Sequence, residues 1–182
     1  MKILDSKGFT MIEIVIVIFI TGIIGSMAAG LLYQGADIYV KETDRQGFIS
    51  QSRSAFWRLK REVQGQRSSE DFYQSGQAIL NLKNANNIPR VFRVASNKFE
   101  ISLDGSNYGD LSNDFFSNNF YFYDNIFSDM TPLSSGSLSL PDAERVHLTK
   151  LKITFQKGSD SLSLSSYVYP INFRFGKKMS YH

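Results

Sequence analysis

The sequence Gly8-Phe9-Thr10-Met11-Ile12-Glu13 opens the stretch that decides the fold of this 182-residue chain. From Ile14 to Ala36 no side chain is charged, and an apolar helix of that length can cross a bilayer. A short segment with two lysines, Lys2 and Lys7, comes before the motif. Basic residues followed by an apolar run indicate either a secretory signal peptide or a membrane anchor.

A carboxylate at the start of the apolar run argues against a secretory signal peptide. Glu13 is costly in a membrane unless an opposite charge pairs with it. The run is also longer than the apolar segment of a typical signal peptide, and no clear small-x-small cleavage pattern follows it. The uncleaved sequence offers no obvious partner for Glu13. Cleavage between Gly8 and Phe9 would create an α-amine on Phe9, four residues before the carboxylate.

The motif and the aliphatic run together closely resemble the class III signal of type IV prepilins and pseudopilins. The resemblance implies that a prepilin peptidase cleaves after Gly8 and methylates the new N-terminal Phe9, and that Glu13 helps to seat each subunit during assembly. A second stretch, between Asp37 and Val63, is similar to minor pilins of the mannose-sensitive haemagglutinin (MSHA) pilus of the MshO type. It is more distantly similar to J-type pseudopilins of type II secretion. The resemblance covers about the first third of the chain.

The resemblance implies a structural subunit of a filament, namely a minor pilin that contributes to assembly or initiation of a type IV pilus. Expected partners are other minor and major pilins, the prepilin peptidase, the inner-membrane assembly platform and the lipid bilayer, but no nucleic acid. The alternative within the class is a pseudopilin of a type II secretion system. An alternative of another class is a membrane-anchored periplasmic binding protein or adhesin, although a mere tether has no need of Glu13. The expected location is the inner membrane, with one span and a periplasmic C-terminal domain, and then the pilus or pseudopilus.

One long helix is predicted from Phe9 to about Gln64. Its first half is apolar all round, as a lipid-embedded helix is. In its second half apolar and small residues recur at spacings of three and four, which places them on one face. These residues are Phe48, Ser52, Ala55, Phe56, Leu59 and Val63. No small domain can bury such a helix along its whole length, so we expect the front half to project and the back half to pack on a sheet. Arg58 and Glu62 are four residues apart and are expected to form a weak ion pair.

The polar segment from Gly65 to Gln77 is predicted to be a loop. After it the period of the apolar residues changes to two, which predicts strands. The expected strands are Arg90–Val94, Lys98–Leu103, the stretch from Val146 to Phe155, and Ser161–Tyr169, with Ile171, Phe173 and Phe175 as a possible continuation. Lys157-Gly158-Ser159-Asp160 is predicted to be a hairpin turn. The expected fold class is α+β, with the long N-terminal helix packed on an antiparallel β-sheet, as in type IV pilins. The expected organisation is a cleaved leader at 1–8, a transmembrane and assembly helix at 9–36, the amphipathic half of the helix at 37–64, and a periplasmic globular domain at 65–182.

The remaining candidate sites are weaker. Seven aromatic residues crowd between Phe115 and Phe127; Phe120 and Phe122 are expected in the core, whereas Tyr121 and Tyr123 are better interface candidates. The segment from Asp104 to Asp110 has the oxygens of a calcium loop without the EF-hand spacing, and a plain turn is the favoured interpretation. The chain has no cysteine and two isolated histidines, His147 and His182, so no metal site and no cofactor are expected. No catalytic motif is present, and an enzyme is not expected.

Overall fold

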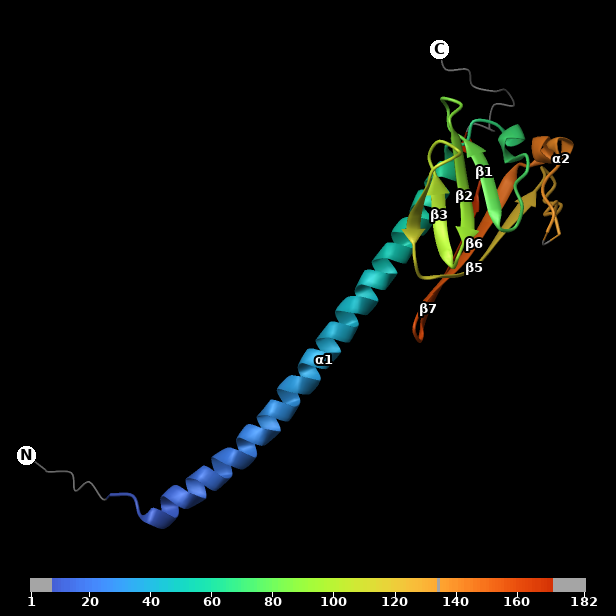
Figure 1. Ribbon diagram of the computed structural model, residues 1–182. Coiled ribbons are helices and arrows are strands. Elements are labelled where there is room, and N and C mark those ends of the chain that lie inside the picture. The colour runs from blue at the N-terminus through green and yellow to red at the C-terminus, as the bar shows by residue number, and fades with distance from the viewer. Residues whose placement is uncertain (1–7, 134, 172–182) are drawn as a thin grey trace, which may run out of the picture. The chain divides into compact units, whose positions relative to one another are not determined.

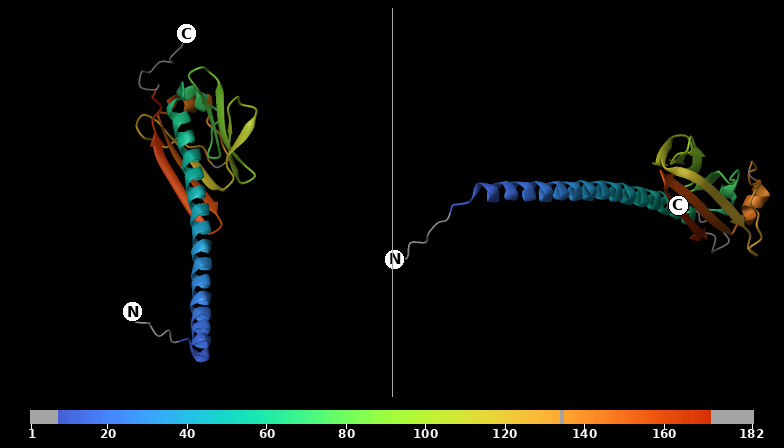
Figure 2. Two further views of the ribbon diagram at one scale, coloured as in Figure 1. Left: turned by 90° about the vertical axis from the view of Figure 1, so that its left-hand side faces the viewer. Right: turned by 90° about the horizontal axis from the view of Figure 1, so that it is seen from below.

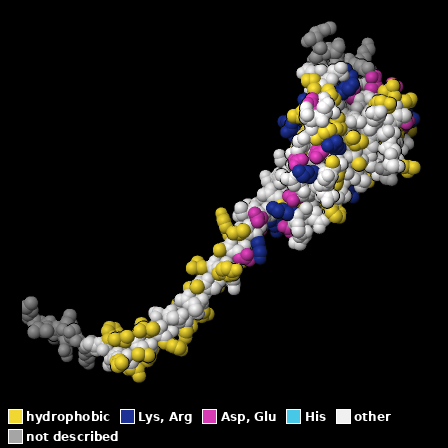
Figure 3. All heavy atoms as spheres, viewed as in Figure 1, with side chains coloured by type: hydrophobic (Ala, Val, Ile, Leu, Met, Phe, Trp, Pro, Cys, Tyr) yellow, Lys and Arg dark blue, Asp and Glu magenta, His cyan; other side chains and the backbone are white. Residues whose placement is uncertain are grey.

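The computed structural model describes residues 8–133 and 135–171, and the chain divides into two compact units, one up to Arg45 and one from Gln46 onward. Helix α1 (Met11–Gln64) confirms the prediction of a long N-terminal helix (Figure 1). In the first unit every described side chain is exposed, and large apolar side chains cover the helix surface (Figure 3). By length and composition α1 contains a stretch able to cross a membrane.

In the second unit the back part of α1 is amphipathic, as predicted. Its buried residues are Phe48, Ser52, Ala55, Phe56, Leu59 and Val63, the same six that share a face in the sequence pattern. The expected pairing of Arg58 with Glu62 is wrong. Glu62 instead lies against a strand, with its Oε2 3.7 Å from the Nε of Arg90. The Glu62 carboxylate thus contacts an arginine of another element and does not pair with the arginine one turn before it in the helix.

Seven antiparallel strands follow, and they form two sheets where the sequence predicted one. The first sheet has the order β1 (Ile79–Lys83), β2 (Pro89–Ala95), β3 (Lys98–Ser102) and β4 (Tyr108–Ser112). The second has the order β5 (Phe115–Tyr123), β6 (Leu148–Lys157) and β7 (Asp160–Val168). The β2–β3 and β6–β7 hairpins confirm the predicted strand pairs, including the turn at Gly158. Phe173 and Phe175, the possible continuation of the last strand, lie outside the described residues.

One hydrophobic core joins the back part of α1 to both sheets. Leu59 and Val63 of the helix share this core with side chains from the two sheets. Figure 2 shows the end of α1 beside the strands of the sheets. Phe99 of β3 connects the sheets directly. Its ring stacks on that of Phe115 with centroids 6.4 Å apart and meets the ring of Phe155 edge-on at 6.5 Å. The α+β, type IV pilin-like architecture expected from the sequence is confirmed; the second sheet is the addition.

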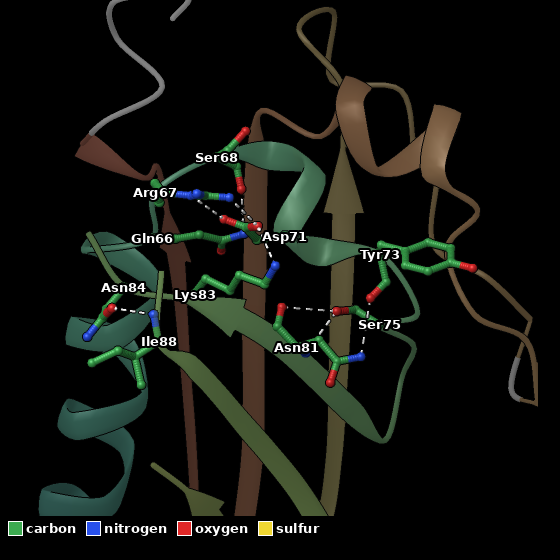
Figure 4. A network of polar contacts seen from close by, with 10 residues as sticks. All are labelled: Gln66, Arg67, Ser68, Asp71, Tyr73, Ser75, Asn81, Lys83, Asn84 and Ile88. Carbon is green, nitrogen blue, oxygen red and sulfur yellow. Dashed lines mark hydrogen bonds and ion pairs between the residues drawn. The ribbon is translucent and has the colours of Figure 1, made fainter. Parts of the chain in front are cut away.

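Polar contacts fix the connection between α1 and β1, which contains the 3-10 helix η1 (Ser69–Phe72) (Figure 4). The Asp71 carboxylate is almost fully buried and lies 3.1 Å from Arg67 Nη2 and 3.7 Å from Lys83 Nζ. A buried carboxylate needs such partners, because the lost hydration is otherwise uncompensated. Farther along, the backbone N–H of Asn81 donates to Ser75 Oγ at 2.9 Å. The short helix α2 (Leu140–Arg145) begins at Ser139, whose hydroxyl accepts from Asp142 N.

Candidate functional site

The sequence motif lies at the very start of α1. Gly8, Phe9 and Thr10 precede the first helical residue, Met11, and have no regular secondary structure. The Phe9 side chain is 79% exposed, and a Cβ placed on Gly8 would meet no atom within 4 Å. The Gly8–Phe9 peptide bond therefore lies outside the helix, between two exposed residues.

Thr10 and Glu13 cap the helix reciprocally. Glu13 Oε2 accepts hydrogen bonds from Thr10 N and from Thr10 Oγ1, both at 2.8 Å. The Glu13 N–H in turn points to Thr10 Oγ1 at 3.4 Å, and Ile14 N donates to Thr10 O at 3.3 Å. This is a capping box, in which a Thr at the N-cap and a Glu three residues later satisfy each other's backbone N–H groups.

The capping box corrects one expectation from the sequence. Glu13 does have a partner in the uncleaved chain, namely the N–H and hydroxyl of Thr10. The Thr-x-x-Glu pattern at Thr10 to Glu13 is the sequence signature of this contact. The contact is between a carboxylate and neutral donors, so it leaves the charge of Glu13 unbalanced. It also holds the carboxylate at the N-terminal end of the helix, on the side where Phe9 lies.

The aromatic segment of β5 divides between core and surface as predicted. Phe120 and Phe122 are fully buried, whereas Tyr121 and Tyr123 are half-buried. The ammonium of Lys150 lies 5.6 Å from the ring centroid of Tyr121 and 5.2 Å from that of Tyr167. A hydrogen bond to Tyr167 raises the pKa of Lys150, and burial raises the pKa of Tyr123. Lys150, Tyr121 and Tyr167 thus form a cluster on the surface of the second sheet.

The segment from Asp104 to Asp110 is a turn in the structure. Asp104 Oδ1 accepts from the backbone N–H groups of Asn107 and Ser106, each at 2.8 Å, and these bonds hold the pKa of Asp104 well below its usual range. Asp110 lies 2.5 Å from Lys98 Nζ. Both carboxylates are thus occupied by protein donors. Across the described ranges 8–133 and 135–171, His, Cys, Asp and Glu nowhere gather in a group of three that could hold a metal ion.

His147 lies between α2 and β6, and its backbone N–H donates to Tyr123 O at 2.8 Å. The residue is half-buried, and among the described residues its Nδ1 has no hydrogen-bond partner. The other histidine, His182, lies outside the described residues.

A model of the prokaryotic N-terminal methylation motif matches residues 4–29, which include Gly8, Phe9 and Glu13. A comparison with curated proteins gave no match. Together with the apolar first half of α1, the motif indicates membrane anchoring, and it points to a structural subunit rather than to an enzyme. The family match and the α+β architecture together indicate a type IV pilin-like or pseudopilin-like protein.

Proposed function

We propose that the chain is made as a prepilin, is cleaved after Gly8, is methylated at the new N-terminal Phe9, and then joins a type IV pilus as a minor subunit. The observation that carries the proposal is the exposed Gly8–Phe9 bond directly before a long apolar helix with Glu13 in its first turn. In this proposal residues 1–8 are the leader, 9–36 the transmembrane and assembly helix, 37–64 its amphipathic half, and 65–182 the periplasmic domain.

Glu13 is the assembly residue in this proposal. Cleavage turns the amide nitrogen of Phe9 into an α-amine, which carries a positive charge. In the precursor this nitrogen is an uncharged amide, so it offers the Glu13 carboxylate no counter-charge. Pairing between the carboxylate of one subunit and the amine of a neighbour would compensate both charges in a medium where unpaired charges are costly. Such a pair also sets the axial position of an incoming subunit. The partners are therefore other minor and major pilins, the prepilin peptidase and the inner-membrane assembly platform.

The N-terminal peptide tests the processing step. Mass spectrometry of protein purified from membranes should find a peptide that begins at Phe9 with a methylated amine. Gly8→Trp should leave the precursor uncut. A peptide that begins at Met1, or a cut beyond Leu32, would contradict the proposal. A reporter fused after His182 should be active in the periplasm, because Lys2 and Lys7 favour a cytoplasmic N-terminus.

The MSHA-like minor pilin is proposed over two alternatives because of the resemblance of the stretch from Asp37 to Val63 to MshO-type subunits. A pseudopilin of type II secretion shares the same motif and differs in what the filament does. A deletion strain separates the two: loss of surface pili supports the pilus subunit, and loss of secreted proteins with normal pili supports the pseudopilin. A strain with normal pili and normal secretion would favour an anchored binding protein or adhesin.

A further inference from the structure

The back part of α1 carries a basic face opposite the one that packs on the core. From Gln46 to Arg61 the helix has no acidic residue. The residues that we call the basic stripe are Arg53, Trp57, Arg58, Lys60 and Arg61. Leu59 and Val63 are fully buried, which holds the helix in one rotational position. Arg53, Trp57 and Arg61 are exposed on the side away from the core, and Arg58 and Lys60 flank them and are half-buried.

The cations of the basic stripe differ from others of this unit in their ion pairing. Within the part of the chain that the structure describes, none of its four cations forms an ion pair with a carboxylate. Arg58 Nε is buried and has no hydrogen-bond partner there. Glu62, the nearest acidic residue in sequence, is turned to Arg90 on β2. By contrast, Arg67, Arg93 and Arg145 of the same unit each have a carboxylate partner.

Trp57 stands within these charges with 61% of its surface exposed. Lys60 Nζ lies 4.9 Å from the centroid of its ring. Trp57 also borders a shallow hollow whose other lining residues are Ser54, Arg58, Arg61 and Gln64. An exposed indole among arginines is the composition of an interface hot spot, because Trp and Arg are the residues most enriched there.

The helix dipole does not account for the stripe. Cations stabilise the last turn of a helix by interacting with its free carbonyl groups, and the effect falls off within that turn. Since α1 ends at Gln64, the dipole can account for the cation at Arg61, which lies in the last turn, but not for the cation at Arg53. A merely solvated face has no need of an exposed indole.

We propose that the basic stripe is the docking surface for an acidic helix of another filament subunit. Arg53, Trp57 and Arg61 are spaced by four residues and form one ridge, and such ridges pack into the grooves of a second helix. The guanidinium groups are suited to carboxylates, which they bind with two parallel hydrogen bonds. Small residues continue the same face, and a Cβ at Gly47 would meet no atom within 4 Å, so a partner backbone can approach closely.

The partner that fits is a helix with carboxylates four residues apart and an apolar groove between them for the indole. A nucleic acid strand fits less well, because proteins that bind single strands present several aromatic rings in a concave groove. The stripe has one ring on a convex helix. This inference rests on the proposed function, since it names the kind of subunit that the chain selects.

Trp57 is the only tryptophan of the chain, so its fluorescence reports on the stripe directly. The full-length protein, held in nanodiscs of zwitterionic lipid, is titrated with a stapled helical peptide that carries glutamates at i, i+4 and i+8 around a central leucine. We expect a saturable blue shift of the emission that weakens with salt. The same peptide with lysines in place of the glutamates should give none. A blue shift with a single-stranded oligonucleotide or with anionic vesicles, but not with the acidic peptide, would overturn the proposal, and so would no shift with any probe.

Charge reversal supplies the matched control. Arg53→Glu/Arg61→Glu should weaken peptide binding at least about tenfold, because each change replaces attraction with repulsion. Lys152→Glu/Lys157→Glu makes the same change of charge at two exposed positions of β6 and should leave binding unchanged. An equal loss of peptide affinity in both double variants would mean that binding depends only on net charge, and this would overturn the proposal.

In cells the two proposals fail differently. The stripe variant should still be cleaved after Gly8 but should no longer co-purify with its partner pilins. An uncut wild-type chain contradicts the proposed function. A cut stripe variant that co-purifies as well as the wild type contradicts the docking surface alone.

Discussion

Leu59 lies on the buried face of the part of α1 that belongs to the second unit. Its side chain is fully buried in the core that also contains side chains of both sheets. Two positions earlier Trp57 is largely exposed, so neighbouring residues of one helix have opposite environments. The sequence predicts this contrast because only one face of an amphipathic helix can meet the core.

Leu59→Ala should lower the free energy of unfolding of the second unit by roughly 2–5 kcal/mol, since it removes buried methyl groups and leaves a cavity. Urea unfolding of the full chain in mild detergent, followed by the near-UV circular dichroism of the buried aromatic residues, measures this loss. Ser54→Ala on the exposed face is the matched control and should change little. A loss for Leu59→Ala no larger than for Ser54→Ala would place this face in solvent.

Asp124 is a second residue on which local structure depends. Its carboxylate accepts from the backbone N–H groups of Ser128 at 2.8 Å and Ile126 at 3.0 Å, and lies 3.3 Å from Arg145 Nη2. The hydrogen bond from Ser128, followed by those from Ile126 and Arg145, lowers the pKa of Asp124. These bonds hold the turn in which Phe127 has a positive φ of 61°.

A carboxyl whose pKa is lower in the folded than in the unfolded chain stabilises the fold above its unfolded pKa. That contribution is lost as the pH falls through the folded pKa. Asp124→Asn should therefore be less stable than the wild type at pH 7, and the difference should shrink in acid. Melting temperatures at a series of pH values test this. A difference that stays constant down to acidic pH would mean that the charge of Asp124 has no part in stability.

Among the elements, hairpins were predictable where strands alternate and the turn residues are distinctive. The β2–β3 turn contains Ser96 and Asn97 with φ of 50° and 61°, the backbone of a type I′ turn. Strand β4 was missed because its exposed residues, Gly109 and Asp110, are adjacent rather than alternate. Helix α2 was missed because six residues are too few to show a helical period.

The division of the strands into two sheets was also not predicted from the sequence. Alternation tells which side of a strand is buried, but it does not tell which strand lies beside it. Phe99 and Phe155 are both buried and both alternate with polar residues, yet they belong to different sheets that face a common core. The sequence places the N-terminal motif at the start of the long helix because its spacing is local, but the capping contacts of Glu13 with Thr10 were missed. The contact of Glu62 with Arg90 depends on the tertiary fold.

Ser96→Asn/Asn97→Gly should raise the free energy of unfolding by about 1 kcal/mol, because Asn-Gly adopts the left-handed region with less strain than Ser-Asn. The converse change, Gly158→Ala, forces a Cβ into a φ of 60° in the β6–β7 hairpin and should lower stability by a similar amount. Urea midpoints of both variants provide the measurement. Changes of the same sign in the two hairpins would show that turn strain is not what these positions control.

At the scale of the whole molecule, the N-terminal motif and the core belong to different compact units. Glu13 lies in the first, with Thr10 as its partner, and Leu59 lies in the second. A change at Glu13 is therefore expected to affect processing or assembly without unfolding the second unit. Glu13→Val should keep membrane insertion and cleavage, because the apolar run remains, and should impair joining to other pilins. The measurement is co-purification with the other minor pilins from membranes, together with a count of surface pili.

The capping box makes a sharper control possible. Glu13→Gln keeps an acceptor for the Thr10 N–H, since Gln also serves at this position of a capping box, but it removes the charge. If Glu13 acts by pairing with the α-amine of Phe9 on a neighbour, Gln and Val should impair assembly alike. If it acts by capping α1, the Glu13→Gln variant should assemble normally, whereas the Thr10→Val variant should be impaired in assembly. A subunit at the very tip of a filament has no neighbour ahead of it and tolerates the loss of charge better than a major pilin. Unchanged co-purification and piliation in both Glu13 variants would contradict an assembly role for this carboxylate.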